Sequence, residues 1–270
     1  MGASTTIRSL ERGLTVLQAL QNHPIASLHD VYLQTHISKP SLLRILNTLE
    51  KSGLVSRRLA DGRYRISANL SHLARKRDRY DGVAEAAAPV LDRLCQKISW
   101  PSDLMVPAGD HMEIRESSRV RTPFTGYFMH DRIGTPINWL LSAVGRAYLA
   151  YCPENEREKI LAQVRRSELA ENRLARNVTA VKRILAETRM KGFGTRDESF
   201  GGGAYGRHAP DGLAGIAVPL LDRGRVHGVI NIIWAKAART IEDMAHDHVL
   251  DLRGAAFEIV ESLRQHKRRV

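Results

Sequence analysis

The chain has 270 residues, of which 43% are hydrophobic and 26% charged, and its formal net charge is +12 at pH 7. This composition is typical of a globular protein with about two domains, and it excludes a disordered chain. No apolar run approaches the roughly 18 residues of a membrane span, and the start of the chain lacks the apolar core of a secretory signal. The two cysteines are too few for a disulfide framework, which favours a cytoplasmic protein.

The positive charge is concentrated near the N-terminus. Residues 1–80 contain 13 Lys and Arg but only 5 Asp and Glu, so that two thirds of the excess charge lies in under a third of the chain. Such a distribution favours a polyanionic partner for this part, although a basic surface that serves only solubility would look the same.

Residues 7–66 show the pattern of a winged helix-turn-helix. Apolar residues at helical spacing predict a first helix over 7–21, whose stripe is Ile7, Leu10, Leu14, Leu17 and Leu20. Ser27 is expected to cap a short second helix that ends near Thr35, and a third helix begins around Ser38. Two strands, 55–59 and 63–66, then flank Asp61-Gly62, which predicts a two-residue type I′ turn.

The third helix is predicted to be the one that reads DNA. Its leucines gather on one side, namely Leu42, Leu43, Leu46 and Leu49. Small polar and basic residues occupy the other side, and a basic hairpin follows. The expected DNA-binding residues are Ser38, Lys39, Ser41, Arg44, Thr48 and Lys51 of the helix, with Arg57, Arg58 and Arg63 of the wing. An ordinary solvated helix face is the alternative, but the order of helices, turn and hairpin favours binding of double-stranded DNA.

The predicted fold class is α+β in three parts. Residues 1–68 form the winged helix-turn-helix, 69–82 a linker helix, and 83–270 a second domain. In that domain, helices are expected over 84–98, from Ser142 to Tyr151, from Asn177 to Lys191, and after Thr240. Strands are expected over 104–107, 112–116, 213–221 and 226–234, combined in one mixed sheet that carries the helices.

Three segments of the first part, SLERGLTVLQAL, SKPSLLRILNTLEKSGLV and DGRYRIS, resemble the N-terminal domain of IclR-type bacterial transcriptional regulators. Three later ones, PINWLLSAVGRAYLAYCPE, KGFGTRDESF and LAGIAVPLLDRGRVHGVINI, resemble the GAF-like α/β effector-binding domain of that family. The short stretches ISWPSDLMV and AYCPENER are similar to regulators of aromatic-acid catabolism, especially of hydroxyphenylpropionate degradation.

This resemblance implies a regulator that senses a small, aromatic carboxylic acid and controls a catabolic operon. It implies homodimers or dimers of dimers on paired half-sites, with RNA polymerase as a further partner and no cofactor. The effector-binding positions implied are Met129, Ile137, Trp139, Leu141, Ser142, Ala143, Val144, Asp197, Ile216, Val218, Asn231 and Ile233. The chain departs from the family pattern at Asn138-Trp139, where smaller or more polar residues are usual.

Residue chemistry alone also supports a carboxylate site at Ser142, because the amides at a helix N-terminus attract anions. Core packing is the alternative for each apolar pocket residue. The opposing hypothesis is a metabolic enzyme with an appended basic module that binds nucleic acid or protein. No catalytic or metal-binding set is found, since His246 and His248 splay to different helix faces and the glycines at 201–203 lack a following Lys-Ser/Thr. Cys95 and Cys152 are expected to be buried, inert thiols.

Overall fold

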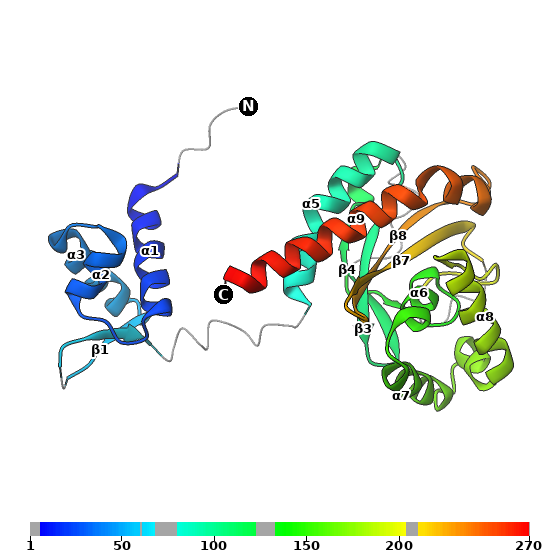
Figure 1. Cartoon of the computed structure of the whole chain (residues 1–270), viewed down its shortest axis with the longest axis horizontal. Helices are drawn as coiled ribbons and strands as arrows, with labels where there is room; N and C mark the ends of the chain where they lie inside the picture. The colour runs from blue at the N-terminus through cyan, green and yellow to red at the C-terminus, as the bar shows by residue number, and fades with distance from the viewer. Residues whose placement is uncertain (1–5, 60, 68–79, 123–132, 204–209, 270) are drawn as a thin grey trace. The chain divides into compact units, whose positions relative to one another are not determined.

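The computed structural model describes residues 6–59, 61–67, 80–122, 133–203 and 210–269. The chain divides into two compact units, Met1–Arg77 and Asp78–Val270 (Figure 1). Of the predicted linker helix over 69–82, residues 69–79 lie outside the described part. Residues 81 and 82 already belong to the first helix of the second unit, so that helix starts earlier than predicted.

The first unit is the predicted winged helix-turn-helix. Its elements are α1 (Arg8–Asn22), α2 (Leu28–Thr35), α3 (Lys39–Lys51), β1 (Val55–Arg57) and β2 (Tyr64–Ile66). The cap of α2 is a full capping box, because Ser27 Oγ accepts from the Asp30 amide at 3.2 Å and the Asp30 carboxylate accepts from the Ser27 amide at 2.7 Å. The latter bond lowers the pKa of Asp30. The buried core of the unit is Val16, Leu20, Ala26, Val31, Ile37, Leu42, Leu46, Leu49, Val55 and Tyr64.

The apolar stripe of α1 lies largely outside this core. Ile7, Leu10 and Leu14 are 66%, 58% and 52% exposed, whereas Val16 and Leu20 are fully buried. The predicted helix is confirmed, but the first half of its apolar stripe is exposed. These three side chains form a continuous apolar face on α1, called here the α1 face.

The wing also differs from its prediction. The Arg58 amide bonds to the Arg63 carbonyl at 2.8 Å, so four residues, and not two, connect the paired positions. Asp61 Oδ1 accepts from the Arg63 amide at 3.2 Å, which is the local Asx-type contact that reshapes the turn. Gly62 takes a positive φ of 68°, as a turn of this kind requires.

The second unit alternates helices and strands around one sheet. Its elements are α5 (Asp81–Ile98), β3 (Asp103–Ala108), β4 (His111–Ser117), η1 (Arg119–Arg121), β5 (Pro136–Ile137), α6 (Ala143–Tyr151), α7 (Glu154–Arg165), η3 (Ala170–Arg176), α8 (Val178–Lys191), β6 (Gly194–Thr195), β7 (Leu213–Asp222), β8 (Arg225–Ala235) and α9 (Ile241–Arg269). The predicted caps at Ser142, Asn177 and Thr240 each accept an amide of the first helical turn. Both cysteines are buried as predicted, and burial raises the pKa of Cys152 to about 12.

Among the described residues the sheet has the order β5-β4-β3-β8-β7-β6, and every neighbouring pair is antiparallel. The predicted mixed sheet was wrong in this respect. Two hairpins, β3–β4 and β7–β8, supply four of the strands, and they also meet antiparallel at β3 and β8.

Helices cover both faces of the sheet (Figure 1). One face packs on α5 and α9 through residues such as Ile216, Val218 and Ile232. The other packs on α6, α7 and α8 through residues such as Met105 and Ala217. Side chains alternate between the faces along each strand, so this second surface, called here the α6 face, also carries Asn231, which pairs with Ala217. Within the described part of the chain, no helix has the length and apolar character needed to cross a membrane.

Candidate DNA-binding and effector-binding sites

The polar side of α3 is free to meet a ligand. Arg44, Thr48 and Lys51 are exposed, and Ser41 is half-buried. Neither Arg44 nor Lys51 has an ion-pair partner among the residues that the structure describes. At the start of the helix, Ser38 and Lys39 are exposed as well. The six predicted α3 residues are therefore at least partly accessible to solvent, and Ser41, Arg44 and Thr48 line the same side of the helix, which suits phosphate and base-edge contacts.

The basic wing is held by contacts within the hairpin. Arg57 Nε donates to the Gly62 carbonyl at 3.0 Å, and its guanidinium lies 5.6 Å from the Tyr64 ring centre. Arg58 and Arg63 lie 3.5 and 3.9 Å from the Asp61 carboxylate. Asp61 thus orients two of the wing arginines while it offsets only part of their charge.

A groove between α1 and α3 adds residues that the sequence analysis missed. It has a volume of about 530 Å³, and Ser9 and Arg12 of α1 face Ser41, Arg44 and Thr48 of α3 across it. The position of Arg12 outside the apolar stripe indicated an exposed basic residue. Only the packing of α1 on α3 places Arg12 and Arg44 in the same groove.

The start of α6 is a preformed helix N-terminus. Ser142 Oγ accepts from the Gly145 amide at 3.0 Å and donates to the Asn138 carbonyl at 2.6 Å. The Asn138 side chain accepts from the Leu140 and Leu141 amides, each at 2.9 Å. By contrast, the Ala143 and Val144 amides have no hydrogen-bond partner among the described residues. Two adjacent N–H groups at the positive end of a helix are suited to a carboxylate.

Two glycines allow the backbone to close tightly around this turn. A Cβ at Gly145 would lie 2.1 Å from the Trp139 carbonyl oxygen, and one at Gly194 would lie 2.1 Å from the Ala143 carbonyl oxygen. Only glycine fits where two backbones come this close, so the backbones of β6 and of the turn at Trp139 contact the backbone of α6 directly.

Asp197, which follows β6, forms an ion pair with Arg146 of α6. Its carboxylate accepts from Arg146 Nη2 at 2.7 Å and from Ser199 Oγ at 2.7 Å. Burial acts to raise the pKa of Asp197, but the bonds from Ser199 and Arg146 outweigh it and hold that pKa below the ordinary value. Asp197 is therefore an ionised acceptor, already paired with a buried guanidinium.

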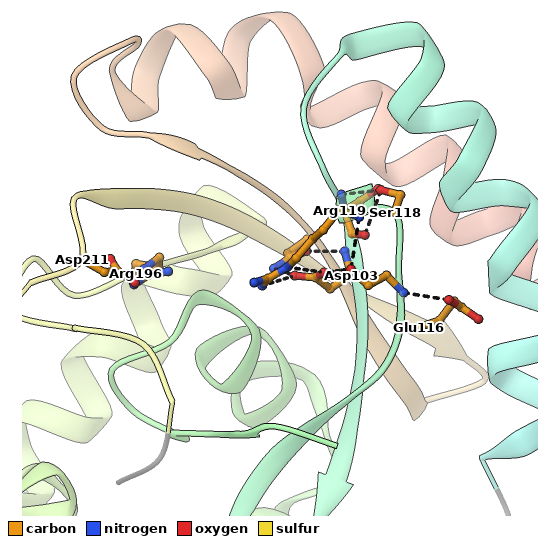
Figure 2. A network of polar contacts seen from close by, with 9 residues as sticks. Asp103, Glu116, Ser118, Arg119, Arg196 and Asp211 are labelled. Carbon is orange, nitrogen blue, oxygen red and sulfur yellow. Dashed lines mark hydrogen bonds and ion pairs between the residues drawn. The ribbon is translucent and has the colours of Figure 1, made fainter. Parts of the chain in front are cut away.

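Asn231 belongs to a buried network centred on Asp103. Figure 2 shows Asp103 and Arg119 of this network. Arg119 donates to both Asp103 oxygens, from Nε at 2.9 Å and from Nη2 at 2.8 Å, and Ser117 Oγ donates at 2.7 Å. Asn231 Oδ1 accepts from the Asp103 amide at 2.7 Å. The Asp103 side chain is fully buried and that of Arg119 is 8% exposed, so this is a desolvated, bidentate ion pair.

A second ion pair, between Arg196 and Asp211, lies outside this network (Figure 2). Arg196 Nη2 donates to both oxygens of Asp211, at 2.8 and 2.7 Å, and to the Phe200 carbonyl at 3.1 Å. The Arg196 guanidinium lies 4.7 Å from the Phe200 ring centre.

The structure brings most, but not all, of the predicted effector residues together. Ser142, Ala143, Val144, Leu141 and Asp197 adjoin the start of α6, and Asn231 and Ile233 lie on the same α6 face by strand alternation. Ile216 and Val218 are corrected here, because they point to the opposite face and pack on α5 and α9. Their neighbours Gly215 and Ala217 hold the α6-face positions that pair with Ile233 and Asn231.

Three further predicted effector positions do not belong to this group. Ile137 and Trp139 lie in the core beneath α6, where the Trp139 ring meets Tyr148 edge-on at 5.5 Å. Met129 lies outside the described residues. The polar residues Asp103, Arg119, Arg146, Arg196 and Asp211 were missed, because no sequence spacing signals contacts made across the sheet. No group of three or more metal-binding side chains occurs in the described ranges.

Family models match both units. The model of the IclR helix-turn-helix domain matches residues 9–59, and that of the bacterial transcriptional regulator IclR C-terminal domain matches residues 79–260. The chain belongs to the IclR family. It is therefore a DNA-binding transcriptional regulator and not an enzyme, which confirms the predicted family and excludes the alternative of a metabolic enzyme.

Similar proteins agree with this IclR assignment. The transcriptional regulator SauR of Cupriavidus necator is 27% identical over 237 residues, which are 87% of this chain and 88% of SauR. A transcriptional regulator of Rhodococcus sp. RHA1 shares the fold with a TM-score of 0.53 and 22% identity, covering 96% of this chain and 99% of that one. An IclR homologue of Microbacterium hydrocarbonoxydans, solved in complex with 4-hydroxybenzoate, has a TM-score of 0.51 and 20% identity, covering 95% and 99% of the two chains.

Proposed function

We propose that this IclR-family regulator senses a small aromatic carboxylic acid and thereby controls a catabolic operon. The observation that carries the proposal is the pair of amides at Ala143 and Val144, which have no partner among the described residues and begin a helix on the α6 face. The helix dipole adds positive potential at that point, so a carboxylate is the group that fits.

The charges around this turn favour one negative charge on the ligand. Among the described residues, three guanidinium groups near the start of α6 or on the adjoining strands are each paired with a carboxylate: Arg119 with Asp103, Arg146 with Asp197, and Arg196 with Asp211. Because the charges within each of these pairs cancel, the positive potential that is left in this region comes from the start of α6. A monoanionic acid is the ligand class that this balance supports.

An aromatic ring is supported by the surroundings and by a homologue. Gly215 and Ala217 are small, while Leu141, Ile233 and Phe200 supply apolar surface nearby. Ligand sites combine such apolar walls with a few polar groups. The bound 4-hydroxybenzoate of the Microbacterium hydrocarbonoxydans homologue is an acid of this class.

On the DNA side, we propose that α3 enters the major groove and that the wing and Arg12 contact phosphates. Arg44 stands in the middle of the exposed face with no ion-pair partner among the described residues, so its guanidinium is available for a guanine edge. The α1 face supports a homodimer, since three exposed apolar residues on one helix suit contact with the same helix of a second copy.

The DNA assignment is tested by operator binding at increasing salt concentrations. Arg44→Ala is expected to weaken specific binding by about 1–3 kcal/mol and to relax base preference at one position. Arg12→Ala is expected to weaken binding to all sequences alike and to lower the salt slope by about one. Arg183→Ala, on an exposed face of α8, is the control and should change neither quantity. Unchanged operator affinity in Arg44→Ala would refute the assigned reading face.

The effector assignment is tested by thermal and calorimetric binding with aromatic and aliphatic acids. An acid present at about 100 times its dissociation constant should add roughly 2.7 kcal/mol to the free energy of unfolding. The matching primary amides should add nothing, because they lack the charge that the α6 amides bind. If no acid in the panel shifts the unfolding transition, the proposed sensor function is wrong.

A further inference from the structure

Two polar atoms near the proposed effector site, Trp139 Nε1 and Arg196 Nε, are buried without a hydrogen-bond partner among the described residues. Arg196 Nε is the one that belongs to a charged side chain. Arg196 Nε is inaccessible to solvent and has no hydrogen-bond partner in the described part of the chain, and the Arg196 side chain as a whole is 10% exposed. The Nη2 atom of the same residue bonds to Asp211 and to the Phe200 carbonyl. A buried N–H without an acceptor costs free energy, so such a group in a ligand-binding unit points to an acceptor supplied by the ligand.

The position of Arg196 places this donor on the α6 face. Gly194 pairs with Ala217, and Arg196 follows two residues later on the same side of the sheet. The Arg196 Cδ atom lies 3.4 Å from where a Cβ of Gly215 would be, so the side chain extends over the bare backbone of β7.

The same segment adjoins the carboxylate site. The Asp197 amide donates to the Leu141 carbonyl at 2.8 Å, and Arg146 of α6 donates to the Thr195 carbonyl at 3.2 Å. Arg196 and the start of α6 are therefore two polar groups flanking one surface of small and apolar residues.

We infer that Arg196 is a specificity-determining residue whose Nε–H binds a neutral oxygen on the effector, in the manner of a ring hydroxyl. This inference rests on the proposed sensor function and names a second contact of the same ligand. A neutral acceptor, and not a second carboxylate, fits because Asp211 already balances the guanidinium charge, with both of its oxygens accepting from Nη2. Arg196 would then distinguish hydroxylated acids from their unsubstituted parents.

A purely structural role for Arg196 makes a different prediction. The Nη2 atom bonds to both the Phe200 carbonyl and the Asp211 carboxylate, so loss of Arg196 removes both contacts. Loss of that role would weaken binding of every acid alike. Loss of an Nε–H contact would weaken binding only of acids that carry the oxygen.

The test measures dissociation constants by calorimetry on the full chain. The probes are benzoate and 3-phenylpropanoate, each beside its 3-hydroxy and 4-hydroxy ring derivatives. The proteins are wild type, Arg196→Lys, the charge-neutral pair Arg196→Met/Asp211→Asn, and the exposed control Arg183→Met. Wild type and control should bind one hydroxylated acid about ten-fold more tightly than its parent. In both Arg196 proteins this ratio should fall to within about two-fold, while affinity for the parent acid is retained.

Three results would decide against the inference or its basis. A hydroxyl preference that persists in both Arg196 proteins would show that another group reads the oxygen. No hydroxyl preference in wild type, with the parent acids still bound, would overturn the inference and leave the proposed function standing. Failure of every acid to bind wild type would instead overturn the proposed function itself.

If the Arg196 variants do not fold, a measurement on the wild-type protein alone still tests the inference. The methyl ether of the preferred hydroxylated acid keeps the oxygen acceptor but loses the donor. Affinity within about two-fold of the hydroxylated acid supports an N–H donor in the protein, and a drop to the roughly ten-fold weaker affinity of the parent acid contradicts it.

Discussion

At the scale of single residues, the α6 side of the second unit contains ion pairs that are buried or partly buried. A buried pair contributes little net stability compared with an apolar pair, but removal of one partner leaves an uncompensated charge. The Arg119–Asp103 pair is the most enclosed of the three, since Asp103 has no exposed side-chain surface.

Arg119→Met is therefore expected to lower the free energy of unfolding by about 3–5 kcal/mol, because Asp103 keeps its charge without a counter-ion. The double variant Asp103→Leu/Arg119→Met should be more stable than this single variant, since no charge stays buried. Urea unfolding of both proteins checks the order. A single variant as stable as wild type would mean that the pair is solvated.

The lowered pKa of Asp197 predicts a pH dependence. An acid whose folded-state pKa lies below its unfolded value of about 3.9 stabilises the fold above that pH and loses this contribution as the pH falls through the folded pKa. Asp197→Asn should therefore be less stable than wild type near neutral pH, by roughly 0.2–1 kcal/mol because a third of the side chain is exposed. The difference in urea midpoints should vanish at acidic pH, and a difference that grows there would refute the sign.

At the scale of elements, the helices that begin at a local capping signal were predicted correctly, whereas the pairing of strands across the sheet was not. The starts of α2, α6 and α8 were predicted because their caps, Ser27, Ser142 and Asn177, act on the amides of the next turn. The face of β7 was not, because a shift of one residue in register moves every side chain to the other face. This is why the resemblance pointed to Ile216 and Val218, whereas Gly215 and Ala217 occupy the α6 face.

Glycine positions test the tight start of α6. Gly145→Ala should destabilise the protein by about 1–3 kcal/mol or more, because its Cβ meets the Trp139 carbonyl rather than a movable side chain. Gly254→Ala in the exposed middle of α9 is the matched control, since nothing lies within 4 Å of its Cβ, and it should stabilise by about 0.5–1 kcal/mol. Thermal unfolding compares the two, and equal effects of the same sign would contradict this account.

At the scale of the whole molecule, the chain consists of a DNA-binding unit and a second unit, each with its own core. The order of helices, turn and hairpin, together with the charge distribution, indicated which unit meets DNA. The sequence could not reveal the α1 face, because an apolar stripe at helical spacing predicts a buried surface whether the partner is the same chain or a second copy.

The α1 face leads to a prediction about assembly. Leu10→Lys/Leu14→Lys should leave the unfolding transition nearly unchanged, because both side chains are already more than half exposed. It should nevertheless reduce operator affinity and make it depend more steeply on protein concentration, as expected when half-site binding loses its dimer contact. Sedimentation and operator titrations measure both effects. Wild-type affinity in this variant would exclude α1 from the dimer contact.

The arginine–aspartate pairs also have an evolutionary consequence. Because either member alone would leave a charge in a desolvated place, a lineage can rarely lose one without the other. Arg196 and Asp211 should therefore appear and disappear together among descendants of a common ancestor. Where both are absent, we expect the proposed preference for hydroxylated acids to be lost while the helix start proposed for the carboxylate is kept.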